Sequence, residues 1–297
     1  MDSMPLQELD PERETDRICG FISGFVSGRK ASGLALGLSG GLDSSVVAAL
    51  AARALGPERV HALFLPERDS SKQSGDDARD LAGRLGIVYT VRDLTPALKE
   101  LGCYESGASG IAVLGGAPRA AVGLFPGLAR KGFLATLSGG GGRSFREFTA
   151  FYRIKHRLRT VAVYREAEER NLAAASCANR TEYETGFFVR YGDDAGDIAP
   201  IKHLYKTQVF ALGRHLGLPE RILAKRPSPD LFGGMKDEEI LGIGYEELDS
   251  ILWCIARGLP DEEIGERTGC SGKSISYARK IASLSARLRE PPADLMG

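Results

Sequence analysis

The sequence predicts an α/β fold in which helices cover both faces of a parallel sheet. Short apolar runs of strand length alternate with segments whose apolar residues recur at helical spacing. Glycine or proline separates most of these runs, and a serine–glycine turn leads from the first apolar run directly into a helix. Such alternation is typical of a doubly wound sheet, because parallel strands need a crossover connection between them.

The N-terminal part of the chain supplies three strand–helix units. Its expected helices are residues 12–30, 43–55 and 74–85. Its expected strands are the short apolar runs 33–38, 60–65 and 87–91. Gly56-Pro57 ends the second helix and Gly86 ends the third, since glycine and proline continue a helix poorly. These units predict three neighbouring parallel strands.

Residues 102–143 interrupt the alternation. They are rich in glycine, including the run Gly139–Gly142, and carry few charges. We expect an irregular and mobile insertion at about 97–145, of the kind that forms lids or partner surfaces or is simply a tolerated surface loop.

Regular patterning resumes after this insertion. The expected elements are a long helix at 145–170, a fourth strand at 172–176 and a helix at 206–216. The tail at about 235–289 reads as several short helices, broken at Gly242, Gly258-Leu259-Pro260 and Gly269. We expect residues 1–297 to form a single domain that includes the insertion and this helical tail.

Composition excludes several classes of protein. The 297 residues are 43% hydrophobic and 26% charged, which is ordinary for a globular chain. Lysine plus arginine equals aspartate plus glutamate at 39 each, which argues against a protein that coats nucleic acid. The sequence shows no apolar run long enough for a transmembrane helix and no signal peptide, so we expect no membrane partner and a cytoplasmic location. Its five scattered cysteines favour reduced thiols over a disulfide framework.

The strongest chemical signal is the string Leu38-Ser39-Gly40-Gly41-Leu42-Asp43-Ser44. Two glycines allow a tight turn and a close approach to a ligand, and the N-terminus of the following helix attracts anions, most often phosphate. Asp43 adds a like charge to such a site, unless it holds a Mg²⁺ ion that bridges the carboxylate to phosphate oxygens. The string is neither a Walker A loop nor a dinucleotide-binding GxGxxG motif.

This SGGxDS string resembles the pyrophosphate-binding loop of the ATP pyrophosphatases. The resemblance implies an enzyme that adenylylates a carboxylate or carbonyl, releases pyrophosphate and admits a nitrogen or sulfur nucleophile. The loop alone does not choose among NAD synthetases, GMP synthetases, asparagine synthetases and tRNA-modifying relatives. The second half of the chain is similar to the ammonia-dependent NAD synthetase family over residues 176–182, 186–193, 197–201, 204–209, 225–231 and 244–249. The implied fold is adenine nucleotide α-hydrolase-like.

The resemblance assigns roles to matching positions. ATP would be bound by residues Gly37, Leu38, Ser39, Gly40, Gly41, Leu42, Asp43, Ser44, Cys177, Lys206 and Ser228. Mg²⁺ would be held by Asp43 and Glu182. Deamido-NAD would be bound by Lys155, Arg190 and Asp197. The ATP half of the site matches the family better than the acceptor half, because Arg190 and the C-terminal pair Arg287-Leu288 differ from the acceptor positions of the family.

The chain departs from the usual sequence of the family at a few of these positions. The family usually has threonine where Cys177 stands, and a thiol donates a weaker hydrogen bond than a hydroxyl. It usually has lysine where Arg190 stands, and the two cations are not interchangeable. A C-terminal His-Lys pair that contacts the dinucleotide in the family is replaced here by Arg287-Leu288.

The implied reaction converts deamido-NAD, ammonia and ATP to NAD, AMP and pyrophosphate through an acyl-adenylate. No nucleophilic side chain is required, so we reject a Cys177 thioester. The few residues before the first strand leave no space for an amidase domain, which implies free ammonia or ammonia from a separate partner. The family resemblance also implies a homodimer.

Three alternatives remain open from the sequence. The chain could be a related amide ligase that acts on a different carboxylate, or a non-catalytic nucleotide-binding homologue. Residues 261–280 also resemble a DNA-binding helix-turn-helix. We disfavour this interpretation because the family has helices there.

Overall fold

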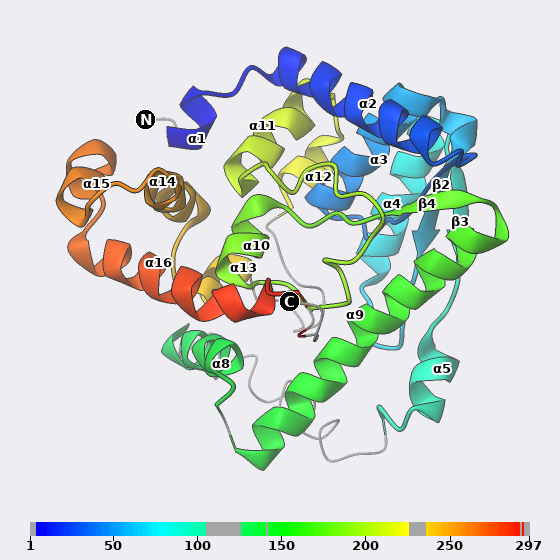
Figure 1. The fold of residues 1–297 in the computed structure, drawn as a ribbon. Coiled ribbons are helices and arrows are strands. Elements are labelled where there is room, and N and C mark those ends of the chain that lie inside the picture. Colours follow the sequence, from blue (N-terminus) through cyan, green and yellow to red (C-terminus); the bar gives the residue numbers. More distant parts are fainter. Residues whose placement is uncertain (1–3, 105–125, 141, 226–235, 292, 294–297) are drawn as a thin grey trace.

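A parallel sheet lies toward the right-hand side of the molecule as seen in Figure 1. The computed structural model describes residues 4–104, 126–140, 142–225, 236–291 and 293. Within these ranges the sheet has four strands in the order β3-β2-β1-β4. The strands are β1 (Gly33–Gly37), β2 (Val60–Phe64), β3 (Val88–Val91) and β4 (Leu172–Ala175). All three pairings are parallel, and the four strands coincide with the four that the sequence predicts.

Helices make up most of the remaining described chain. The N-terminal ones are α1 (Met4–Gln7), α2 (Pro11–Gly28), α3 (Leu42–Leu55), α4 (Lys72–Leu85) and α5 (Thr95–Glu100). The middle ones are α8 (Pro126–Ser138), α9 (Arg143–Glu169), α10 (Arg180–Thr185), α11 (Lys206–His215) and α12 (Glu220–Leu223). The C-terminal ones are α13 (Asp237–Leu241), α14 (Tyr245–Ala256), α15 (Asp261–Thr268) and α16 (Gly272–Ser285).

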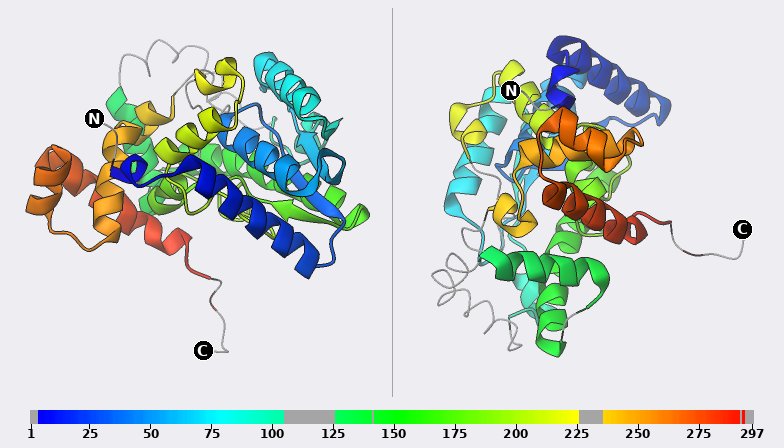
Figure 2. Two further views of the ribbon diagram at one scale, coloured as in Figure 1. Left: turned by 90° about the horizontal axis from the view of Figure 1, so that it is seen from above. Right: turned by 90° about the vertical axis from the view of Figure 1, so that its left-hand side faces the viewer.

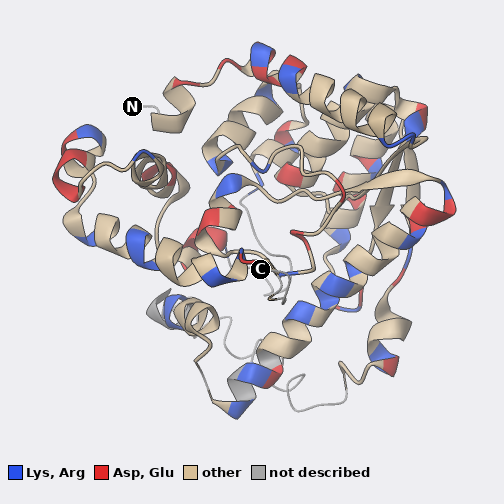
Figure 3. Ribbon diagram, in the orientation of Figure 1, with Lys and Arg blue, Asp and Glu red and all other residues tan. Residues whose placement is uncertain are grey.

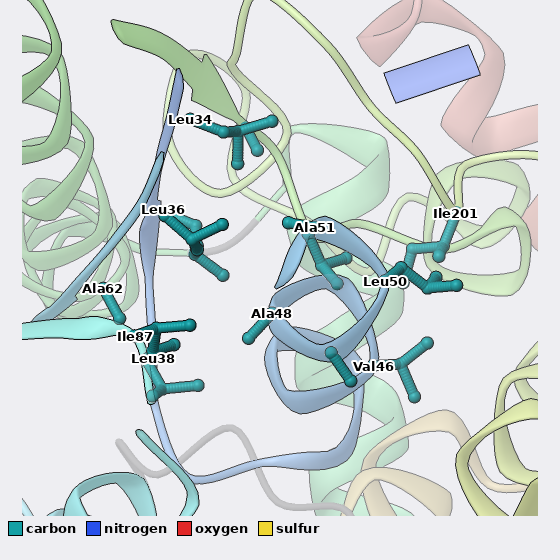
Figure 4. Close-up of a cluster of buried hydrophobic side chains, with 14 of the residues drawn as sticks. Leu34, Leu36, Leu38, Val46, Ala48, Leu50, Ala51, Ala62, Ile87 and Ile201 are labelled. Atoms are coloured by element: carbon teal, nitrogen blue, oxygen red, sulfur yellow. The ribbon is translucent and has the colours of Figure 1, made fainter. Parts of the chain in front are cut away.

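The two faces of the sheet are covered by different helices. Leu34 and Leu36 of β1 are buried in a core formed with α2, α3, α4 and α11. Ala35 lies between them in sequence and is buried in a separate core with α5 and α9. This division follows from the two-residue period of a strand, which sends successive side chains to opposite faces. Figure 4 shows Leu34, Leu36 and Leu38 beside Ala48 and Ala51 of α3. The predicted doubly wound architecture is therefore confirmed.

The C-terminal helices form a third hydrophobic core at one end of the molecule (Figure 2). Leu248, Ile251 and Leu252 of α14 pack there with Ile275 and Ile281 of α16. Helix α14 also contacts α10 and α11, the two helices that begin beside the carboxyl end of β4. The breaks predicted at glycines 242, 258 and 269 fall between these helices, as expected.

The prediction of an irregular insertion is wrong for part of its length. Residues 126–138 form helix α8, which packs against α13 and α16. Phe133 and Leu137 are buried in the C-terminal core, so the helix is stabilised by tertiary packing that a glycine-rich sequence did not reveal. Residues 105–125 lie outside the described residues.

Charged side chains of both signs are spread over the described surface, with several basic positions along α9 (Figure 3). Among the described residues, no helix is both long enough and apolar enough to cross a membrane.

Candidate functional site

The glycine turn after β1 has a geometry that requires glycine. Gly40 adopts a φ of +75°, and a Cβ atom there would lie 2.3 Å from the carbonyl oxygen of Ser74. The Ser39 hydroxyl accepts the N–H of Gly41 at 3.2 Å and lies 3.1 Å from the Ser44 hydroxyl. The turn leads into α3 through Gly41, and the first turn of a helix presents backbone N–H groups without helical partners. This arrangement is an anion-binding site at a strand-to-helix turn.

Two acidic side chains and one lysine meet beside this turn. Lys206 donates a hydrogen bond from Nζ to Oδ2 of Asp43, and its Nζ lies 3.8 Å from Oε1 of Glu182. Burial alone would lower the pKa of Lys206, but Asp43 and Glu182 raise it above its usual value. Burial and Asp43 raise the pKa of Glu182 well above its usual range, while Lys206 opposes that rise. The two carboxylates therefore face a shared position that favours positive charge.

Asn179 holds the two acidic residues in place. Its side-chain amide donates to Oδ1 of Asp43 at 2.9 Å. Its side-chain oxygen accepts the N–H of Glu182 at 3.0 Å, and Oε2 of Glu182 accepts the N–H of Asn179 at 3.2 Å. The pair forms a capping box at the start of α10. The string Asn179-Arg-Thr-Glu182 carries this signal, but the sequence reasoning did not assign Asn179.

Asp249 of α14 connects the starts of α10 and α11. Its fully buried carboxylate accepts the Thr181 hydroxyl at 2.6 Å and the N–H of Thr207 at 2.9 Å. The Thr181 hydroxyl in turn accepts the N–H of Lys206 at 2.9 Å. Burial raises the pKa of Asp249 to about 6, although these hydrogen bonds oppose the rise. One carboxylate thus fixes the residues beside both Glu182 and Lys206.

A cavity of about 300 Å³ opens in front of these groups. Its described lining includes the glycine turn, Asp43, Glu182 and Lys206. Leu63, Phe64 and Leu65 at the end of β2 add an apolar wall, and α9 contributes Tyr152, His156 and Arg159. Its size is at the lower end for small-molecule sites, and apolar walls with a few convergent polar groups are typical of them. Of the predicted ATP-binding residues, only Gly40 and Ser228 are missing from this lining: Gly40 is covered, and Ser228 lies outside the described residues.

Cys177 and Asp193 line the side of the cavity next to β4. Burial, Asp43 and Glu182 all raise the pKa of the Cys177 thiol, which disfavours the reactive thiolate. The N–H of Val189 donates to the Asp193 carboxylate at 2.7 Å. Asp193 keeps 41% of its side chain exposed and lies 3.6 Å from Nδ1 of His156. The sequence reasoning assigned neither Asp193 nor His156.

The three residues predicted to bind the acceptor do not line this cavity. The Lys155 side chain is 2% exposed, and its ammonium donates to Glu67 at 2.9 Å and to Asp69 at 3.0 Å. Its charge is therefore used inside the protein, where it ties α9 to the segment after β2. Lys155 is not among the described residues that line the cavity.

Arg190 and Asp197 also have protein partners. Arg190 donates to the carbonyl oxygen of Glu290 at 2.7 Å, near the C-terminus. The Asp197 carboxylate accepts the N–H of Ala174 at 2.9 Å, at the end of β4. Both residues lie outside the lining of the cavity, whereas the predicted ATP and metal residues converge on it.

Comparison with known proteins matches this chain to one family over most of its length. The sequence profile of the family described as NAD synthase matches residues 14–109 and 144–292, which leaves out the central part of the insertion. The chain is 43% identical over 249 residues to the NH3-dependent NAD+ synthetase of Thermotoga maritima, covering 83% of this chain and 86% of the relative. It is 37% identical to the NH3-dependent NAD+ synthetase of Methanopyrus kandleri, covering 89% of this chain and 80% of that protein.

Solved structures share this fold. An NMN synthetase from Francisella tularensis superposes with a TM-score of 0.73 at 26% identity, covering 98% of this chain and 100% of that one. An NH3-dependent NAD synthetase from Campylobacter jejuni, solved with a nitrate ion, has the same fold, with a TM-score of 0.70 at 24% identity and coverage of 97% and 100%. From its sequence, its parallel sheet and its glycine turn, the chain belongs to the NAD synthase family.

Proposed function

We infer that this protein is a ligase that amidates the nicotinate carboxylate of deamido-NAD with ammonia and cleaves ATP to AMP and pyrophosphate. The observation that carries this conclusion is the meeting of Asp43, Glu182 and Lys206 beside the glycine turn, in a chain of the NAD synthase family. A turn that binds phosphate next to two carboxylates is what an ATP-cleaving site requires.

We assign the ATP half of the reaction to the first turn of α3 and its neighbours. Residues 37–44 would surround the phosphates, and the Ser39 and Ser44 hydroxyls would add donors. Lys206 remains protonated because Asp43 and Glu182 raise its pKa, so it can donate to a phosphate oxygen once those carboxylates have another cation. Cys177 would contact the nucleotide from the end of β4, and we keep the same role for Ser228 as a prediction.

The residues present fit a Mg²⁺ ion that binds together with ATP. Asp43 and Glu182 offer two carboxylates toward one point, and Mg²⁺ is usually held by one or two carboxylates plus substrate phosphates. Among the described residues there is no group of three or more His, Cys, Asp or Glu side chains placed to hold a metal by themselves. Bound there, the ion would supply positive charge to the phosphates.

The chemistry then needs two displacements and no covalent enzyme intermediate. A carboxylate oxygen of deamido-NAD forms a bond to the α-phosphorus of ATP, and the bond from that phosphorus to pyrophosphate breaks. The turn and Lys206 stabilise the charge that grows on pyrophosphate. Ammonia then attacks the acyl carbon, AMP leaves with the former carboxylate oxygen, and the amide loses a proton. The protein contributes positioning and charge stabilisation.

A second candidate acceptor is nicotinate mononucleotide. A relative of similar fold and 26% identity is an NMN synthetase, which points to the same chemistry on a mononucleotide. Arg190 and Asp197, predicted to contact the dinucleotide, are occupied by protein partners here. The identity of 43% to an NAD+ synthetase nevertheless favours the dinucleotide.

Parallel assays with the two acceptors test the proposal. Purified protein is given ATP, Mg²⁺ and ammonium with either deamido-NAD or nicotinate mononucleotide, and amide product and pyrophosphate are both measured. We expect the larger kcat/KM with deamido-NAD. A larger value with nicotinate mononucleotide would select the second candidate. If neither acceptor leads to release of pyrophosphate, both candidates are contradicted.

The family resemblance also leads us to propose a homodimer in the cytoplasm. All five cysteines are described and free, which suits a reducing compartment. Light scattering on the purified protein should give twice the chain mass of 31.9 kDa, and the chain mass itself would contradict the dimer.

A further inference from the structure

Lys225 reaches the glycine turn from beyond the end of α12. Its ammonium donates to the Ser74 hydroxyl of α4 at 2.8 Å and to the carbonyl oxygen of Gly40 at 3.4 Å. The side chain is 29% exposed and lines the same cavity as Asp43 and Lys206. Lys225 therefore places a cation directly against the turn that we assign to phosphate binding.

Among the described residues, the charge of Lys225 is only weakly neutralised. The one carboxylate of the described chain that pairs with it is that of Asp77, whose Oδ2 lies 3.7 Å from Nζ. Asp77 is 2% exposed and already accepts Nε of Arg221 at 3.1 Å and the Gln73 amide at 2.9 Å. Oδ1 of Asp77 thus serves Arg221 and Gln73, while Oδ2 faces Lys225 at the wall of the cavity.

The two other cations that line the described part of the cavity also have protein partners. Lys206 donates to the Asp43 carboxylate, and Arg159 donates to the carbonyl oxygen of Leu65 at 3.1 Å. The cavity wall also carries the carboxylates of Glu182, Asp193 and Asp237, which repel a nucleotide triphosphate. An additional cation beside the turn offsets part of that repulsion.

We propose that Lys225 is a pyrophosphate-binding side chain, which contacts the β- and γ-phosphates of ATP and stabilises the leaving pyrophosphate. This inference rests on the proposed function only in taking the glycine turn as the phosphate site. A group that touches Gly40 lies against the phosphates held by that turn, and its ammonium can exchange the weak carbonyl contact for a charged oxygen. Its effect therefore depends on the β- and γ-phosphates, which AMP lacks.

Arg221 provides a matched control. It shares Asp77 with Lys225 and also pairs with Asp80, but it is not among the described residues that line the cavity. Lys225→Met and Arg221→Met each remove one cation from the same carboxylate, yet only the first removes a cation that faces the cavity. Lys225→Arg keeps the charge, and Ser74→Ala removes the hydroxyl that orients it.

Calorimetric titration of each full-length variant with Mg²⁺-pyrophosphate, ATP and AMP tests the proposal. We expect Lys225→Met to weaken pyrophosphate and ATP binding roughly tenfold, the usual effect of one charged hydrogen bond. AMP binding should not change, Arg221→Met should bind all three as the wild type does, and Lys225→Arg should recover part of the loss. If Lys225→Met does not fold, Ser74→Ala should show a smaller loss with the same preference for pyrophosphate.

Equal losses for pyrophosphate and AMP, or the same loss in Arg221→Met, would show that the Asp77 cluster is only structural and would overturn the proposal. Unchanged pyrophosphate binding in Lys225→Met would also overturn it. Since no acceptor is present, these outcomes are separate from the fate of the proposed function: a protein that makes no NAD can still bind pyrophosphate through Lys225.

Discussion

Lys206 donates a hydrogen bond to Asp43, a residue 163 positions earlier in the chain. The contact joins the start of α11 to the start of α3, and Glu182 at the start of α10 lies beside it. Three helices thus begin around one small volume. The ammonium occupies the place where the two carboxylates converge. Under the proposed function, a divalent cation bound there with ATP would replace its charge, and Lys206 would then be free to contact a phosphate.

Glu182→Gln tests the role of this convergence. Glutamine keeps an oxygen that can accept the Asn179 N–H, so the start of α10 should remain capped. We expect a loss of NAD formation on the order of 100-fold and a higher Mg²⁺ concentration at half-maximal rate, because one metal-binding carboxylate is gone. Glu184→Gln on the same helix removes a carboxylate that pairs with Arg180 and should stay near wild type. An unchanged Mg²⁺ dependence in Glu182→Gln would remove this residue from the metal site.

The buried carboxylate of Asp249 predicts a pH dependence of stability. Its pKa of about 6 in the folded protein lies above its usual value of 3.8, so the folded state binds more protons than the unfolded state between these pH values. The contribution of Asp249 to stability is therefore largest below pH 4 and falls as pH rises to about 6, by up to about 3 kcal/mol.

Asp249→Asn isolates this contribution. The free energy of urea unfolding, plotted against pH as the difference between wild type and variant, should favour the wild type more at pH 4 than at pH 7. Glu246→Gln, on the exposed face of the same helix, should give curves parallel to the wild type. Parallel curves for Asp249→Asn would contradict the prediction.

Gly40→Ala should damage the turn itself. The left-handed backbone costs a residue with a side chain about 1–2 kcal/mol, and the new Cβ would also lie 2.3 Å from the Ser74 oxygen. We expect lower stability toward urea and loss of pyrophosphate binding. Gly83→Ala in α4 is the control, since a Cβ there meets nothing within 4 Å and alanine favours a helix. Wild-type pyrophosphate binding by Gly40→Ala would show that this turn does not hold the phosphates.

Cys177 separates nucleotide binding from covalent catalysis. Because burial and two nearby carboxylates raise the pKa of its thiol, we expect Cys177→Ala to keep most of its activity. Cys177→Thr supplies a better hydrogen-bond donor and should lower KM for ATP roughly fivefold. Steady-state kinetics of both variants check this. Complete inactivity of a folded Cys177→Ala would support a thioester after all.

The strands and the glycine turn could be predicted because their signals are local. The run from Gly33 to Gly37 is apolar and short, and Gly40 follows it directly, so strand, turn and helix are all visible within a few residues. Asp43 could be singled out from the string that contains it, but Glu182 and Lys206 could be named only through the family resemblance, because nothing local indicates that residues so far apart in the sequence meet.

Other parts of the site depend on contacts that the sequence does not display. Lys155 resembles a ligand-binding position but pairs with Glu67 and Asp69 on another segment. Asp249 looks like an ordinary helix residue until the fold places it against Thr181 and Thr207. Helix α8 was missed for the same reason, since the burial of Phe133 and Leu137 depends on partners at the other end of the chain.

The most direct test of the account uses deamido-NAD labelled with ¹⁸O in its nicotinate carboxylate, with ATP, Mg²⁺, ammonium and the purified wild-type protein. Mass spectrometry of the products follows NAD, AMP and pyrophosphate together. We predict equal amounts of all three and one ¹⁸O atom in the phosphate of AMP, because the carboxylate oxygen that attacks the α-phosphorus leaves with AMP. Formation of ADP and phosphate, or NAD accompanied by unlabelled AMP, would contradict the acyl-adenylate at this site.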